Sequence, residues 1–142
     1  MKNNLFKCTV FGALLLFGLQ ASAQHFAKGI VYEDSNRNGK RDKREKVLSN
    51  VAVSNGREVV QTNAKGEYSL PVGDDNIIFV VKPSGYSTPV DENNLPKYYY
   101  IHNPNGAPDL KYKGVKPTGP LPKSIDFPLY RVEDKEDFKI MV

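Results

Sequence analysis

One stretch of the sequence carries oxygen-bearing side chains at the spacing of a calcium-binding loop. Residues 34–45 match the pattern D-x-[DN]-x-[DN]-G-x5-E at every fixed position. In such a loop, alternate side chains, one backbone carbonyl and a final glutamate converge on a cation that prefers about six to eight oxygen ligands. The sequence therefore predicts a calcium site whose candidate metal ligands are Asp34, Asn36, Asn38, Lys40 through its carbonyl, Asp42 and Glu45.

The charge of this loop predicts weak binding and leaves a second interpretation open. Three of the candidate ligands are acidic, whereas five basic residues share the loop, namely Arg37, Lys40, Arg41, Lys43 and Arg44. Because like charges raise the electrostatic cost of placing a cation there, we expect a dissociation constant of about 10⁻⁴ to 10⁻³ M. The alternative is an Asx-rich turn that closes through its own side-chain to backbone hydrogen bonds and needs no ion.

Other residues that could do chemistry are few. The chain has two histidines, His25 and His102, and one cysteine, Cys8, which excludes a dense His/Cys metal centre. We expect His25 to be solvated and His102 to be packed or on the surface, and neither has a nucleophile motif beside it. Residues 98–100 are three tyrosines. We expect them to pack in the core, and the alternative is that they form a platform on which a sugar stacks. Because alternate strand residues face opposite ways, at most two of them share a face.

The first 23 residues have the features of a secretory signal peptide. Lys2 and Lys7 precede an apolar run over residues 8–20, and Ala21-Ser22-Ala23 supplies a small-residue cleavage site. The run is shorter than the roughly 20 residues that span a membrane, so an uncleaved anchor is the less favoured alternative. We expect a periplasmic or secreted protein that starts at Gln24 and has no membrane segment after cleavage.

Composition limits the remaining classes. Of 142 residues, 39% are hydrophobic and 25% charged, which excludes a multi-pass membrane protein and argues against wholesale disorder. The net charge of +4 falls to +2 without residues 1–23, because Lys2 and Lys7 are lost. No basic stripe lies outside the loop, so we expect no nucleic-acid partner. Cleavage also removes Cys8, so the exported domain must be held by its core or by an ion.

Short β-like runs separated by turn residues dominate residues 24–86. Runs at 51–54 and 57–62 flank Asn55-Gly56, which predicts a hairpin with a type I′ turn. Runs at 29–32 and 67–70 are also strand-like, and residues 77–81 are apolar without alternation, which predicts a central strand covered on both faces. No stretch has a helical period. The pattern predicts an all-β sandwich of about seven strands.

Prolines change the character of the chain after this core. Nine of the ten prolines lie between Pro83 and Pro128, so this stretch cannot be uninterrupted sheet. We expect residues 87–137 to form a Pro-rich excursion that packs on the sandwich, with strand-like runs at 98–101 and 125–127. The apolar run at 138–142 is expected to lead into a further domain.

Several of these motifs resemble the B-type repeats of bacterial surface adhesins. The resemblance covers Lys28 to Tyr86 and rests on Gly29-Ile30-Val31-Tyr32, the 34–45 loop, Val51-Ala52-Val53 and the turn at residues 62–68. It implies a prealbumin-like (Ig-like) β-sandwich, shared with carboxypeptidase regulatory-like domains. Asn63 stands where those repeats usually have an acidic residue, and Lys46 where they have glycine.

A closer resemblance covers the rest of the chain. Residues 82–86, 98–102, 114–119 and 124–129 are similar to the N-terminal domain of secreted calcineurin-like phosphoesterases. This implies a non-catalytic accessory domain that packs on or positions a C-terminal metallophosphoesterase domain, which would carry the family's dinuclear metal site. No motif of that site is present here, so we expect no phosphatase activity from this chain. The alternative is a stand-alone cell-surface adhesion or glycan-binding module.

Overall fold

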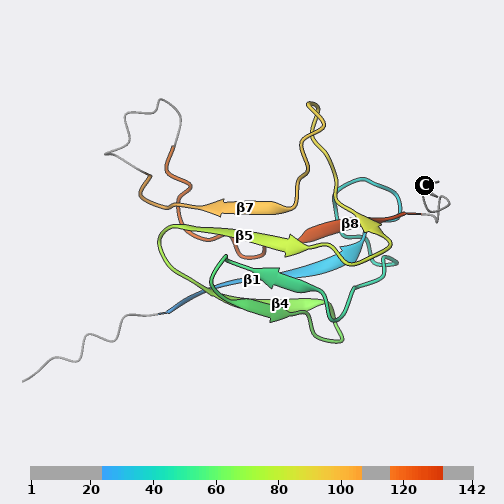
Figure 1. Cartoon of the computed structure of the whole chain (residues 1–142), viewed down its shortest axis with the longest axis horizontal. Coiled ribbons are helices and arrows are strands. Elements are labelled where there is room, and N and C mark those ends of the chain that lie inside the picture. Colours follow the sequence, from blue (N-terminus) through green and yellow to red (C-terminus); the bar gives the residue numbers. More distant parts are fainter. Residues whose placement is uncertain (1–23, 107–115, 133–142) are drawn as a thin grey trace, which may run out of the picture.

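Every secondary-structure element in the described part of the chain is a β-strand (Figure 1). The structure is a computed structural model that describes residues 24–106 and 116–132. The predicted signal peptide (1–23) and the predicted lead-in segment (138–142) lie outside these residues. None of the described residues belongs to a helix that could cross a membrane. Two four-stranded sheets are present, which confirms the predicted all-β sandwich class.

The first sheet joins strands from both ends of the described chain. Its order is β4 (Glu67–Val72), β1 (His25–Glu33), β8 (Phe127–Arg131) and β6 (Tyr86–Ser87). β1 pairs antiparallel with β4 and parallel with β8, and β6 pairs antiparallel with β8. The first strand is therefore held next to the last one.

The second sheet is antiparallel throughout. Its order is β3 (Val59–Gln61), β2 (Ala52–Ser54), β5 (Asn76–Val81) and β7 (Tyr99–His102). The Pro-rich segment thus supplies β7 to this sheet and β8 to the other. The described residues form eight strands, compared with about seven expected from the sequence.

Alternation along the strands places the core between the sheets. In β4 every second residue is buried, and in β1 the buried residues Ala27, Gly29 and Val31 follow the same period of two until Tyr32, which is buried as well. The core residues are Ala27, Val31, Leu48, Val51, Val53, Tyr68, Leu70, Val72, Ile78, Val80, Ile125, Phe127 and Leu129.

The predicted hairpin is present, but the predicted turn type is wrong. Ser54 pairs with Val59, so four residues form the loop rather than two. Only Gly56 has a left-handed φ, of 86°, whereas a type I′ turn requires positive φ at both central residues. The side-chain oxygen of Asn55 instead accepts the N–H groups of Arg57 (2.9 Å) and Glu58 (2.7 Å), which forms an Asx turn.

β5 is central in its sheet, but it is not covered on both faces as predicted. Ile78 and Val80 are buried against the first sheet, whereas Ile77 and Val81 on the outer face are 51% and 50% exposed. The apolar sequence of this strand therefore reflects one buried face and one exposed apolar face.

Gly29 explains how the segment before β8 reaches the first strand. A Cβ at position 29 would collide with the backbone carbonyl of Ile125. Close approach lets the N–H of Ile125 donate to the carbonyl of Lys28 (2.8 Å), while the Tyr68 hydroxyl donates to the Ile125 carbonyl (2.7 Å). The glycine is required here because it has no side chain.

Candidate functional site

The predicted calcium loop starts directly where β1 ends. Asp34, its first residue, is 1% exposed, and its own N–H donates to the carbonyl of Leu129 on β8 (2.9 Å). Its carboxylate accepts the N–H groups of Asn38 (3.2 Å) and Gly39 (2.7 Å). Asp34 therefore fixes the loop to the sandwich from inside, while residues 35–44 are exposed.

The remaining candidate ligands close the loop upon itself. The side-chain oxygen of Asn36 accepts the N–H of Asn38 (3.1 Å), and that of Asn38 accepts the N–H of Lys40 (2.7 Å). Both amide nitrogens donate to the same oxygen of Asp42, at 2.7 and 3.0 Å. Lys40 takes part through its backbone only.

Glu45 joins the two ends of the loop. One of its carboxylate oxygens accepts the N–H of Ser35 (3.2 Å) and the other accepts the N–H of Asp42 (2.9 Å). All six predicted ligands are thus neighbours in one network of short-range hydrogen bonds. The calcium-loop pattern therefore identified residues that form one ordered loop, although the structure joins them by hydrogen bonds and not through a cation.

These bonds are of the kind that the Asx-turn alternative predicts, and calcium binding stays a prediction. The carboxylate oxygens retain further lone pairs, so the donor chemistry suits a hard cation. However, the two amide nitrogens on Asp42 would have to turn away before that carboxylate could face an ion. Within residues 24–106 and 116–132, no three His, Cys, Asp or Glu side chains gather as a metal-holding group.

One basic side chain of the loop is turned toward β8. The guanidinium carbon of Arg37 lies 5.2 Å from the ring centre of Tyr130, a cation–π contact. The backbone of Arg37 is left-handed, with φ of 58°. Burial and the charge of Asp34 raise the pKa of the Tyr130 hydroxyl, and Arg37 opposes them. The sequence did not reveal this contact, because 93 positions separate residues that only the β1–β8 pairing brings together.

The two histidines lie apart from the loop. His25 is exposed at the start of β1, and His102 is 4% exposed on the inner face of β7. The Nδ1 atom of His102 has no hydrogen-bond partner among the described residues. Burial lowers the pKa of His102. His25 is exposed as expected, and of the two placements expected for His102, packed or on the surface, the structure shows the packed one.

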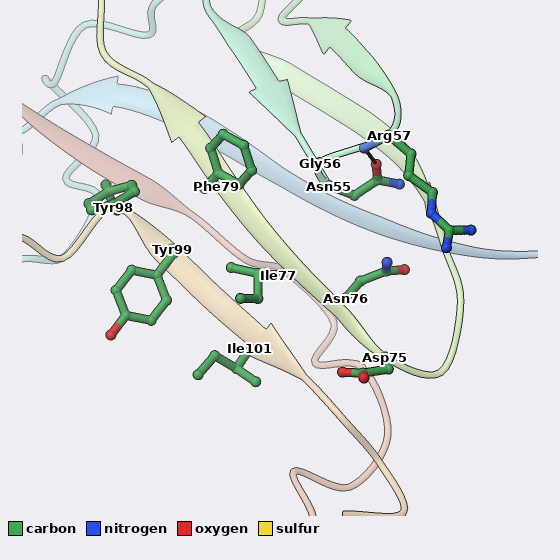
Figure 2. A pocket seen from close by; sticks show the side chains of 10 residues that line it. All are labelled: Asn55, Gly56, Arg57, Asp75, Asn76, Ile77, Phe79, Tyr98, Tyr99 and Ile101. Carbon is green, nitrogen blue, oxygen red and sulfur yellow. Dashed lines mark hydrogen bonds between the residues drawn. The ribbon is translucent and has the colours of Figure 1, made fainter. Parts of the chain in front are cut away.

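A hollow lies on the outer face of the second sheet, and two of the tyrosines considered above as a sugar-stacking platform line it, although the hollow itself was not predicted. It has a volume of about 860 Å³, and we call it the tyrosine hollow (Figure 2). Its lining residues come from the β2–β3 turn and from the neighbouring strands β5 and β7; they are Asn55, Gly56, Arg57, Asp75, Asn76, Ile77, Phe79, Tyr98, Tyr99 and Ile101. Sequence analysis missed this site because it predicted that residues 77–81 form a strand covered on both faces.

Comparison with known proteins matches this chain to one protein family. The model described as "N terminal of Calcineurin-like phosphoesterase" matches residues 35–114, which is more than half of the chain. The matched range begins in the 34–45 loop and includes every strand from β2 to β7. No curated protein gives a significant match.

Proposed function

Because the chain belongs to the family of N-terminal domains of calcineurin-like phosphoesterases, we propose that it is an exported domain that packs against and positions a following catalytic domain. The family match is the observation that carries this proposal. An N-terminal domain is a non-catalytic part of that family, and the catalytic phosphoesterase domain follows it in full-length proteins. The phosphoester hydrolysis would be metal-dependent and would belong to that second domain.

The way in which β8 is held supports a positioning role. β8 lies between β1 and β6, and the N–H of Val132 just after it donates to the carbonyl of Gly85 (2.9 Å). Glu33 at the end of β1 accepts the Tyr86 hydroxyl (2.9 Å) and lies 3.9 Å from the guanidinium of Arg131. Because β8 is held on both sides, its direction is fixed, and it would orient the start of a catalytic domain that follows.

The 34–45 loop and the end of β8 share one end of the molecule, which we call the loop end (Figure 1). The Asp34 N–H bond to Leu129 and the Arg37–Tyr130 contact join them directly. We infer that the catalytic domain contacts this end, where the exposed basic residues of the loop would meet it. Export is supported by the predicted signal peptide at residues 1–23.

Chemical cross-linking of the full-length phosphoesterase tests the contact. We expect lysine cross-links from Lys40 and Lys43 at the loop end to the catalytic domain. Lys116 is the matched control, because its segment lies beside the end of β7, where the N–H of Thr118 donates to the carbonyl of Asn103 (2.9 Å), and β7 ends at the opposite end of the molecule (Figure 1). Cross-links from Lys116, with none from Lys40 or Lys43, would refute this placement.

Mass spectrometry of the exported protein tests the localisation. We expect a mature N-terminus at Gln24, and a protein retained in the cytoplasm with Met1 in place would contradict export. In a separate assay we expect the mature chain from Gln24 onward, without a catalytic domain, to hydrolyse no phosphoester.

A further inference from the structure

The floor of the tyrosine hollow is an exposed apolar surface on two paired strands. Ile77 on β5 pairs with Ile101 on β7, and Phe79 pairs with Tyr99 in the same way. Ile77, Ile101 and Tyr99 are 51%, 46% and 50% exposed. Their side chains lie on one side of the sheet in Figure 2. Apolar surface of this kind, in a concave place, is typical of a binding site.

Two tyrosines form one wall of the hollow. The rings of Tyr98 and Tyr99 are 5.4 Å apart and inclined by 75°, an edge-to-face arrangement. Since the edge of one ring contacts the other ring, aromatic surface remains open to the solvent. Tyr100, the third tyrosine of the run, instead packs against the core.

The opposite wall is polar and carries both signs of charge. Arg57 and Asn55 come from the β2–β3 turn, and Asp75 and Asn76 precede or begin β5. Asn55 is fixed by its Asx turn and by donating its amide to the carbonyl of Pro71 (2.7 Å). Neither Arg57 nor Asp75 has an ion-pair partner among the described residues. The guanidinium of Arg57 and the carboxylate of Asp75 are therefore available to a ligand, whereas the amide oxygens of Asn55 and Asn76 already accept backbone N–H groups.

We propose that the tyrosine hollow binds a neutral polysaccharide. A sugar ring has apolar C–H faces, which suit the tyrosine rings, and a rim of hydroxyl groups, which suit side chains that donate and accept hydrogen bonds. One positive and one negative side chain balance each other, which favours an uncharged ligand over an anionic one. The volume lies within the usual range of ligand sites, about 300–1,000 Å³.

The hollow and β8 belong to different sheets. The hollow lies on the outer face of the sheet β3-β2-β5-β7, whereas β8 belongs to the other sheet and leads toward the loop end. The inference therefore does not depend on the positioning role proposed above.

Affinity electrophoresis of the purified chain tests the proposal. Native gels would contain laminarin, xylan, glucomannan or soluble starch, and we expect at least one of them to retard the protein. Tyr99→Ala should bind at least about tenfold more weakly, because the stacking surface is lost. Tyr99→Phe should retain binding, since the ring remains. Leu95→Ala is the matched control, because Leu95 is 61% exposed and does not line the hollow.

Four results would overturn the proposal. The first is no retardation in any of the four gels, and the second is equal retardation of the Tyr99→Ala variant with an unchanged melting temperature. The third is a dimer of the wild-type chain in sedimentation equilibrium that Tyr99→Ala dissociates, which would assign this face to a second copy. Retardation by heparin alone would likewise reject a neutral ligand.

Discussion

Asp34 is the residue on which the 34–45 loop depends. Its side chain is buried, and its carboxylate accepts two backbone N–H groups. Replacing it by alanine leaves both donors without that partner, and hydrogen bonds to charged groups are worth about 1.5–3 kcal/mol each. We expect Asp34→Ala to lower the free energy of unfolding by about 3 kcal/mol, measured by urea denaturation. Asn36→Ala, at an exposed position, should cost less than about 1 kcal/mol, and equal losses would contradict this account.

Calcium supplies a second prediction for the same residues. With a dissociation constant of about 10⁻³ M, calcium at ten times that value would stabilise the folded chain by about 1.4 kcal/mol. We expect the melting temperature to rise by about 5 °C in a thermal-shift assay. The Glu45→Gln variant, which removes the charge of the final ligand, should show a smaller rise. An unchanged wild-type melting temperature would leave the loop as an ion-free Asx turn.

His102 predicts a pH dependence of stability. Burial lowers its pKa, Asp74 opposes that effect, and His25 adds to it. The unfolded chain then binds the proton at a higher pH than the folded chain, so stability is complete above the ordinary pKa of about 6.5 and falls as the pH drops below it. We expect the melting temperature of the wild type to decrease from pH 7.5 to 5.5. In His102→Gln this decrease should be smaller, and identical pH profiles would exclude His102 as its source.

At the scale of elements, Ile125 can approach β1 only because Gly29 has no side chain. We expect Gly29→Ala to destabilise the fold by more than about 3 kcal/mol or to prevent folding, because the new methyl group meets backbone that cannot move aside. Gly73→Ala is the control, since its Cβ would lie 3.7 Å from the nearest atom, the side-chain oxygen of Asn76. Urea denaturation distinguishes the two, and similar stabilities would refute the steric explanation.

Local elements could be predicted from the sequence, and long-range ones could not. Short strand-like runs between turn residues identified β1 and β4, and Asn55-Gly56 identified the β2–β3 hairpin, because these signals lie within a few residues. The parallel pairing of Val31 with Phe127 has no local signal.

The same limit applies to the two candidate sites. The spacing of residues 34–45 identified a loop that the structure closes by hydrogen bonds. The tyrosine hollow was missed because an exposed apolar residue such as Ile77 has the same sequence pattern as a buried one. Which face of β5 is covered depends on the other sheet, and no local pattern reports that.

At the scale of the molecule, β8 completes the first sheet and buries Phe127 and Leu129. We therefore expect a chain truncated before residue 124 to lose cooperative thermal unfolding and the circular dichroism of a folded β-protein. A chain that ends at Val132 retains every described strand and should unfold cooperatively. Cooperative unfolding of the shorter chain would show that β8 is an addition to a core that is already stable.

The parallel pairing of the first and last strands has a consequence for the order of events in biogenesis. Since β1 needs a neighbour that lies about a hundred residues later, the first sheet cannot close before β8 has been synthesised. Contacts so distant in sequence also form slowly. A nascent chain with this topology keeps its first sheet open until residues 127–131 have emerged, and an open sheet is the state that a secretion pore would require of a cargo.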